Sequence, residues 1–461
     1  MKQKTGVETE LNQLKRIRNF SISEFFDFKG NNTSLRTEIL AGITTFLATM
    51  YIIIVNPMII SNTGMSFSAV LTATVLVSAF SSIMMGIYAK NPIVLAPGMG
   101  INTFFAYSLV IGMHVKWEVA LGVVFWSGTL FLILSMLNIR NAIVNAFPTS
   151  QKQAVAVGIG LFIAVNGFIE SGFIVSHPDT VLGPPAVNPL TITFLVGLII
   201  TAILLAKKVK GALILGIAIT TIICIPIGRL YYDATLSGNP HSTVVSWQGL
   251  WAKPDFSLFF SLDLIGSLRF SLLPAMFSFI FVDMIDSLST FIGVAEASGL
   301  KDSNGKPRNL KQSLIVDAIS SMMSGLFGTS SGSSYIESAT GIAQGGRTGM
   351  TAVVAGLLFI PFMFFSPLLS IVPSVATAPA LIVVGIFMIT PILKINWLDY
   401  EEAIPAFMSI ILIPLTFSIN QGISWGLLCW TILKLFVGKA REITPMLIIL
   451  DLFAIVVLII E

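Results

Sequence analysis

The chain has 461 residues, of which 55% are hydrophobic and only 11% are charged, and its formal net charge is +3. Soluble globular domains carry about 25% charged residues, because their surfaces must stay hydrated. The composition therefore excludes a soluble protein, and the small basic excess, which lies between apolar stretches, gives no indication of nucleic-acid binding.

The N-terminal segment, residues 1–36, is polar and is predicted to stay as a cytoplasmic tail. It contains seven Lys or Arg residues and lacks the apolar core of a signal peptide. Lys and Arg accumulate on the cytoplasmic side of inserted helices. With the tail inside, the loops that fall on the same side carry Lys90, Arg140, Lys152, Lys207, Lys208, Lys210, residues 301–311, Arg347 and Lys394. The long loop 231–253, which is poor in basic residues, then lies outside.

Apolar stretches of roughly 17 to 25 residues follow the tail, each long enough to cross a bilayer as a helix. Examples are residues 38–60, 68–88, 119–137, 190–206, 212–228, 272–294 and 351–369. The whole pattern predicts an all-α polytopic membrane protein with about 14 transmembrane spans in one domain, residues 37–461. Near the C-terminus, residues 401–419 and 421–437 predict a V of two short helices. Residues 444–460 fit either a further span or a helix on the membrane surface.

Two segments, residues 91–107 and 325–341, interrupt the apolar pattern. Each opens with an extended piece rich in Gly and in Pro or Ser, and then becomes helix-like. Irregular backbone at membrane depth is tolerated only where protein or a watery cavity satisfies its N–H and C=O groups. Both segments are therefore predicted to line a cavity.

The two interruptions belong to a repeat. Asn102 and Glu337 lie 235 positions apart, and the same offset maps residues 75–91 onto 310–326 and 38–60 onto 273–295. The chain thus divides into halves, about 37–230 and 268–461, each with a broken third span. Seven spans per half is an odd number, so the halves insert with opposite orientation. Inverted repeats with broken helices are typical of secondary transporters.

Three acids fall inside predicted spans. Asp283 and Asp286 lie mid-span at i and i+3, on one helix face, and Glu337 lies in the second broken segment. A charge inside the membrane costs at least about 2.5 kcal/mol, so such groups face a cavity, a partner or a proton path. Lys434 is the base placed within a span, and no pattern pairs it with these acids. Carboxyl groups that bind and release a proton are what proton coupling needs.

The same residues suit a purine. A carboxylate accepts hydrogen bonds from ring N–H and amine groups, while the amide of Asn102 both donates and accepts. The N-termini of the broken helices add N–H donors for a carbonyl group of the base. Tyr335 and Phe104 either stack on the base or pack in the protein interior.

Five sequence segments carry a close resemblance to a known family. They are TEILAGITTFLATMYIIIVNP, LAPGMGINTFFAY, FVDMIDSLSTFIGVAEASGL, GTSSGSSYIESATGIAQGGRTGMTAVVAGLLF and ATAPALIVVGIFM. They resemble, in order and over residues 37–441, the azaguanine-type purine permeases of the nucleobase–ascorbate transporter family. The resemblance implies 14 spans in two inverted repeats, a core and a gate domain, and a short strand at the start of the third and tenth spans. It also implies proton-driven import of hypoxanthine, guanine and adenine across the cell membrane.

Position by position, the resemblance implies that four residues bind the substrate and couple its transport to protons: Asn102, Asp283, Asp286 and Glu337. The chain departs from the family pattern at Thr103, where Ala is usual, and at Ser289, where Gly is usual. Because Ser289 lies next to the site, the choice among purines stays open. The expected partners are a purine base, a proton and the lipid bilayer; a homodimer is left open.

Two alternatives remain. An anion carrier of the same fold, for sulfate or bicarbonate, is disfavoured by three acids without an evident cavity base. A membrane-embedded hydrolase with residues 328–334 as its nucleophile loop lacks a base to activate a serine. No metal or other cofactor is expected, because the His and Cys residues are scattered. They are His114, His177, His241, Cys224 and Cys429.

Overall fold

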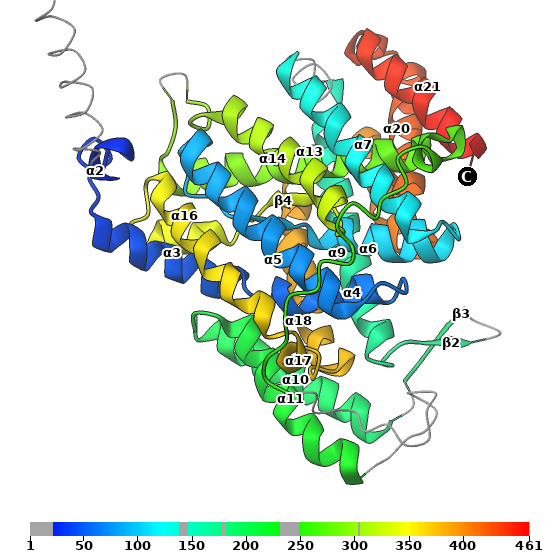
Figure 1. Cartoon of the computed structure of the whole chain (residues 1–461). Helices are drawn as coiled ribbons and strands as arrows, with labels where there is room; N and C mark the ends of the chain where they lie inside the picture. The colour runs from blue at the N-terminus through cyan, green and yellow to red at the C-terminus, as the bar shows by residue number, and fades with distance from the viewer. Residues whose placement is uncertain are drawn as a thin grey trace, which may run out of the picture.

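The computed structural model describes residues 22–460 except 138–145, 178–180, 186, 231–248 and 303–304. Most of the predicted N-terminal tail, Arg140 and most of the predicted outer loop therefore lie outside the described residues. Figure 1 shows a molecule built almost wholly of helices. The chain enters it through a short helix, α2 (Ile22–Phe25).

The elements of the first half begin with α3 (Leu35–Thr49), α4 (Ile52–Ser61), α5 (Phe67–Met84), η1 (Met85–Ala89), β1 (Leu95–Pro97), α6 (Met99–Thr103), η2 (Phe104–Gly112) and α7 (Trp117–Met136). They continue with α9 (Thr149–Glu170), β2 (Val175–His177), β3 (Val181–Gly183), α10 (Pro189–Ala206) and α11 (Ala212–Leu230). The short strands β2 and β3 form a hairpin of their own.

The second half begins with η3 (Gly266–Leu268), η4 (Phe270–Leu272), α13 (Leu273–Ser298), α14 (Leu310–Phe327), β4 (Gly332–Ser334), α15 (Ser338–Ala343), α16 (Gly349–Phe359), η5 (Ile360–Phe364) and α17 (Ser366–Leu369). It ends with α18 (Ser374–Ile389), η6 (Thr390–Lys394), α19 (Tyr400–Thr416), α20 (Ile419–Phe436), η7 (Ala440–Glu442) and α21 (Pro445–Ile460).

Membrane-spanning helices are confirmed. Among the described residues, seven helices are long and apolar enough to cross a membrane, and four shorter apolar helices accompany them. The shorter ones are Met99–Gly112, Ala212–Ile227, Gly349–Phe364 and Pro445–Ile459. The predicted V of two helices near the C-terminus is present as α19 and α20, which pack on each other.

The first span is not one continuous helix. It breaks between α3 and α4 at Met50 and Tyr51, where the N–H groups of Ile53 and Ile54 bond three residues back, to Met50 and Tyr51. Pro57 inside α4 removes another helical donor. The apolar run 38–60 concealed this break, because aliphatic residues continue through it.

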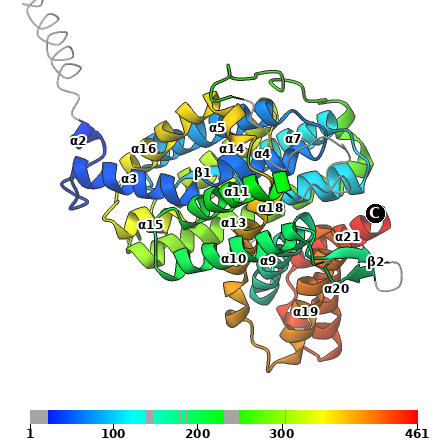
Figure 2. The same cartoon turned by 90° about the horizontal axis from the view of Figure 1, so that it is seen from below.

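The helices pack in two groups. In the first, α14 packs on α7 and α5, and α16 packs on α3 and α5. In the second, α18 packs on α9, α10 and α11, and α9 also packs on α19. Figure 2 shows α9, α19 and α20 gathered on one side of the molecule, away from α3 and α16. Below, the first group is called the core and the second the gate, after the two domains that the resemblance implies. By their contacts, the core also includes α4, α6, η2, α13, α15, β1 and β4, and the gate also includes η6 and α20.

Two glycines allow a close helix crossing within the gate. A Cβ atom on Gly385 of α18 would lie 2.5 Å from the carbonyl oxygen of Gly160 on α9. Small residues let membrane helices approach to backbone contact. This crossing fixes α9, which forms one wall of the cavity described below.

The short strands predicted for the third and tenth spans are present as β1 and β4. They pair antiparallel, with Leu95 opposite Ser334 and Pro97 opposite Gly332. The offset between the strands is 237 positions (332 − 95), two more than the offset found in the sequence. The hydroxyl of Ser82 on α5 both donates to the carbonyl oxygen of Leu95 and accepts from its N–H, each at 3.0 Å. Partners of this kind make irregular backbone tolerable at membrane depth.

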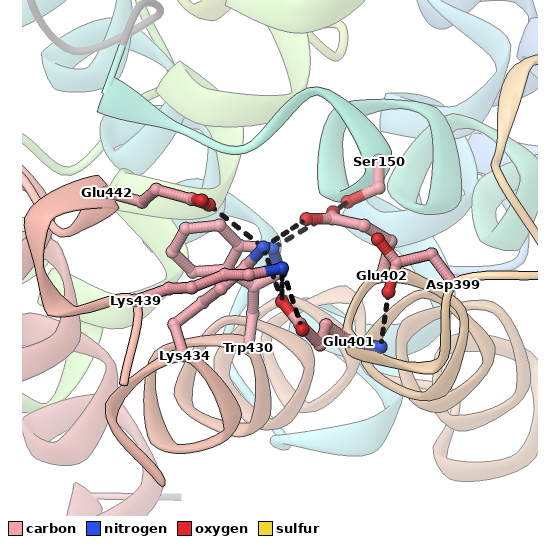
Figure 3. A network of polar contacts seen from close by, with 8 residues as sticks. All are labelled: Ser150, Asp399, Glu401, Glu402, Trp430, Lys434, Lys439 and Glu442. Carbon is pink, nitrogen blue, oxygen red and sulfur yellow. Dashed lines mark hydrogen bonds and ion pairs between the residues drawn. The ribbon is translucent and has the colours of Figure 1, made fainter. Parts of the chain in front are cut away.

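A charge network holds the α19–α20 pair together (Figure 3). Lys434 on α20 lies 3.0 Å from both Glu401 and Glu402 on α19 and 2.9 Å from Glu442, and its side chain is only 4% exposed. The indole of Trp430 also donates to Glu402 at 3.0 Å. Lys434, for which the sequence indicated no partner, therefore forms its ion pairs within the gate and not with the three predicted cavity acids.

Candidate functional site

A cavity of about 390 Å³ lies between the core and the gate. This volume falls in the range of roughly 300–1,000 Å³ that is usual for small-molecule sites. The core contributes Tyr51, residues 98–101, Val282, Asp286, Ser289, Thr290, Gly293 and residues 334–337. The gate contributes Ala156, Ile159, Val384, Phe387, Met388, Thr390, Pro391 and Lys394. One wall is thus polar and the other largely apolar.

Glu337 comes from the second broken segment. It follows β4 and precedes the first residue of α15, so the strand-to-helix turn carries it to the cavity. Its Oε1 accepts a hydrogen bond from the hydroxyl of Tyr51 at 3.0 Å. The acid and its donor come from segments 286 positions apart.

The two aspartates of α13 differ in position. Asp286 lines the cavity and accepts a hydrogen bond from Ser333 at 2.9 Å. Asp283, which is 1% exposed, accepts from Ser321 at 2.5 Å and from Ser331 at 3.3 Å. The structure therefore places Asp286 at the cavity and Asp283 behind it, against α14.

The serines around β4 are donors to these acids. Besides Ser331 and Ser333, Ser334 donates to Asp317 of α14 at 3.2 Å. From the sequence, these serines were considered as part of a hydrolase nucleophile loop, residues 328–334. The alternation of hydroxyls with glycine beside buried acids was the signal that could have revealed this role, since a buried carboxylate needs donors.

Asn102 lies one position beyond the lining residues of α6 and is fully buried. Its side-chain oxygen accepts a hydrogen bond from Ser330. Residues 98–101 line the cavity and Asn102 does not. Gly98, the N-cap of α6, makes no side-chain capping bond. The first N–H groups of a helix have no intrahelical partner, and here they border the cavity.

Of the two predicted stacking residues, Tyr335 lines the cavity and Phe104 does not. Phe104 is 2% exposed and packs edge-on against Phe279, with ring centroids 5.0 Å apart. The hydroxyl of Tyr335 donates to the carbonyl oxygen of Pro97 at 2.6 Å, which fixes its ring beside β1.

Two lining residues were not anticipated. Tyr51 was hidden in the first span, although a tyrosine within an aliphatic run needs a partner for its hydroxyl. Lys394 was assigned to a loop, but it lies exposed at the edge of the cavity. The cavity therefore has a base at its rim, which the argument against an anion carrier had not included.

Away from this cavity, polar contacts join the core to the gate. The hydroxyl of Tyr107 on η2 donates to Glu170 at the end of α9 and accepts from the amide of Asn62 at 3.0 Å. The hydroxyl of Ser108 donates to the carbonyl oxygen of Phe417, between α19 and α20. Within the described residues, no group of three or more His, Cys, Asp or Glu could hold a metal ion.

Comparison with known proteins gives a consistent result. The model of a permease family matches residues 36–425. The adenine permease AdeP of Escherichia coli (strain K12) is 39% identical over 94% of this chain and 94% of its own length. The guanine/hypoxanthine permease PbuG of Bacillus subtilis (strain 168) is 39% identical over 92% of this chain and 96% of its own.

Among solved structures, the transmembrane domain of the cyanobacterial bicarbonate transporter BicA superposes with a TM-score of 0.64, covering 85% of this chain and 97% of that one. Its sequence identity of 18% supports a common fold and nothing further.

Proposed function

We infer the function from one premise: the chain belongs to the permease family. It is a multi-pass membrane transporter and not an enzyme. It carries purine nucleobases, as its relatives named for adenine and for guanine and hypoxanthine do. We propose further that it imports them by proton symport, in the plasma membrane, with its N-terminus in the cytoplasm. The distribution of Lys and Arg supports this orientation.

The observation that carries the proposal is the polar wall of the cavity. Glu337 and Asp286 supply acceptors, and the start of α6 supplies backbone donors. A purine offers both kinds of group on its edges, with ring N–H groups for the acids and a ring nitrogen or carbonyl for the backbone. Opposite them, Phe387 and Met388 of the gate give an apolar surface for the flat ring.

Proton symport rests on the surroundings of the two acids. Asp286 accepts from the hydroxyl of Ser333, and Glu337 accepts from the hydroxyl of Tyr51. A neutral hydroxyl compensates a buried negative charge less than a cation does. These side-chain donors to the two acids are neutral hydroxyls, so we assign the coupled proton to this pair.

An anion carrier is the second candidate. The fold likeness and the position of Lys394 at the rim are compatible with it. Two carboxylates in the cavity repel an anion, however, while a purine base is neutral. A purine substrate therefore accounts for the two carboxylates of the cavity, whereas an anion does not.

Uptake of labelled base in cells without their own purine permeases tests the proposal. Adenine, guanine, hypoxanthine, xanthine and uracil serve as unlabelled competitors. A pyrimidine lacks the imidazole ring and leaves one edge of the site unpaired, so a purine should outcompete uracil by at least about tenfold. Equal competition by uracil would contradict the purine assignment, and inhibition by bicarbonate or sulfate instead would favour the anion carrier.

A further inference from the structure

Tyr51 is built into the cavity wall by a break in the first span. It lies between α3 and α4, is 1% exposed, and still borders the cavity. Its hydroxyl donates to Oε1 of Glu337 at 3.0 Å. The helix tightens here to hydrogen bonds three residues back, and the hydroxyl of Tyr51 leaves it toward Glu337.

The surroundings of Tyr51 hold it in place. Its ring centroid lies 6.5 Å from that of Tyr335, at an interplanar angle of 49°. Tyr335 is in turn anchored by its hydrogen bond of 2.6 Å to the carbonyl oxygen of Pro97. The donor to Glu337 is thus part of a fixed frame rather than a mobile side chain.

We propose that Tyr51 is a positioning and specificity-determining residue, which occupies Oε1 of Glu337 so that the acid meets its substrate with Oε2. The inference rests on the proposed transport of purines through this cavity. It assigns to the first span a part in recognition, beside the broken spans and α13.

This arrangement affects how many hydrogen-bond donors of the purine Glu337 can accept. Guanine carries a ring N–H and an adjacent exocyclic amine, whereas hypoxanthine carries the ring N–H alone. A carboxylate with both oxygens free takes two parallel hydrogen bonds from adjacent donors. Tyr51 takes one acceptor site of Oε1 and fixes the plane of the carboxylate, so Glu337 has fewer sites in line with two parallel donors and the wild-type protein gains less from the extra amine of guanine.

Substitution of Tyr51 by phenylalanine keeps the ring and removes the donor. In Tyr51→Phe, the KM for hypoxanthine should rise about tenfold, because Glu337 loses a charge-assisted hydrogen bond that orients it. The fold-increase in the KM for guanine should be smaller than that for hypoxanthine, by a factor of at least about three, since both carboxylate oxygens become available to its two donors. The maximal rate should change much less than the KM. The ratio of the two KM values is therefore the decisive quantity.

One further variant makes the result interpretable. Tyr88→Phe, at an exposed position in η1, removes a tyrosine hydroxyl outside the cavity and controls for expression. Competition binding of both purines to purified Tyr51→Phe gives the affinity ratio even if that variant accumulates poorly in membranes.

The outcomes separate the two proposals. Wild-type protein that takes up neither purine overturns the proposed function and this inference with it. Wild-type protein that takes up both, beside a Tyr51→Phe variant with an unchanged KM ratio, overturns the role of Tyr51 alone. A uniform loss of maximal rate for both purines would do the same, because it indicates a merely structural residue.

Discussion

At the scale of single residues, the main feature of the cavity is that it contains two buried carboxyl groups. Asp286 and Glu337 are carboxyl groups within a membrane domain, and each receives a hydroxyl donor from a segment far away in sequence. Such donors lower the cost of burial without neutralising the charge. The proposed symport requires these acids to exchange a proton during a transport cycle, which a firm ion pair would oppose.

The first prediction concerns Glu337. Glu337→Gln should abolish purine uptake while the protein still reaches the membrane, because an amide hydrogen-bonds but cannot be an ionised acceptor. Uptake of labelled base, normalised to the amount of protein in the membrane, measures this. Near-normal transport by the variant would remove Glu337 from the site.

The second prediction separates the two aspartates of α13. Asp286→Asn should weaken purine uptake at normal abundance, because Asp286 lines the cavity. Asp283→Asn should mainly lower the melting temperature, because the new NH₂ group has to face hydroxyls that donate to the carboxylate of Asp283. Thermal unfolding in detergent, beside uptake, distinguishes the two effects. The reverse pattern would show that Asp283 is the residue that meets substrate.

Sequence reasoning reached the acids but not their exact roles. Spacing showed that Asp283 and Asp286 share a helix face. The small difference in direction between the two side chains around the helix axis decides which of them reaches the cavity. The same holds for Asn102, which lies just past the lining residues of α6. Tyr51 and Lys394 were missed because their place depends on a helix break and on the gate, and neither leaves a clear pattern in the sequence.

At the scale of elements, the fit of α6 against α9 couples the core to the gate. A Cβ atom on Gly100 would lie 2.4 Å from Cγ2 of Ile159, well inside contact distance. Both residues line the cavity. A movement of the core against the gate would change this contact, so we expect its width to matter for turnover.

We predict that Gly100→Ala lowers the maximal uptake rate several-fold, because the added methyl group collides with Ile159. The double variant Gly100→Ala with Ile159→Ala should recover much of the rate, and Ile159→Ala alone serves as the control. Rates are measured at saturating purine. Failure of the double variant to recover would show that Gly100 is needed for its backbone and not for its small size.

A second element-scale prediction concerns the α19–α20 pair. Lys434→Met leaves the clustered carboxylates of Glu401, Glu402 and Glu442 without their central cation, so the melting temperature should fall by several degrees. Lys439→Met removes a cation that is 44% exposed and should have a much smaller effect. Thermal unfolding of the purified protein compares them, and equal shifts would contradict a special role for the buried lysine.

The sequence predicted helices and strands better than it predicted the roles of single residues. Long apolar runs predicted the spans, and the Gly-, Pro- and Ser-rich interruptions predicted the extended segments in which β1 and β4 lie. The break between α3 and α4 was not predicted, since Met50 and Tyr51 interrupt neither the length nor the apolarity of the run. The offset of 235 differed by two from the offset of 237 between the strands (332 − 95).

At the scale of the whole molecule, the cavity reaches the exposed Lys394, while Tyr107, Glu170 and Asn62 join the core and the gate elsewhere. With the proposed orientation, Lys394 faces the cytoplasm. The end of the cavity that Lys394 marks is then its cytoplasmic end.

The matching prediction is that uptake rises as the external pH falls and collapses with a protonophore, whereas replacing sodium has little effect. The sign follows from coupling: a lower external pH loads the acid with its proton and increases the inward driving force. Uptake in whole cells or vesicles with an imposed pH gradient measures this. Uptake that follows sodium and ignores the protonophore would contradict proton symport.

The pairing of β1 with β4 also constrains how the protein is made. Residue 334 leaves the ribosome on the order of ten to fifty seconds after residue 95, at about 5–20 residues per second. Throughout that interval β1 has no partner strand, and lipid offers its backbone groups none. Ser82 can satisfy Leu95 during this interval, but we expect the third span to take its final place only when the second half of the chain arrives.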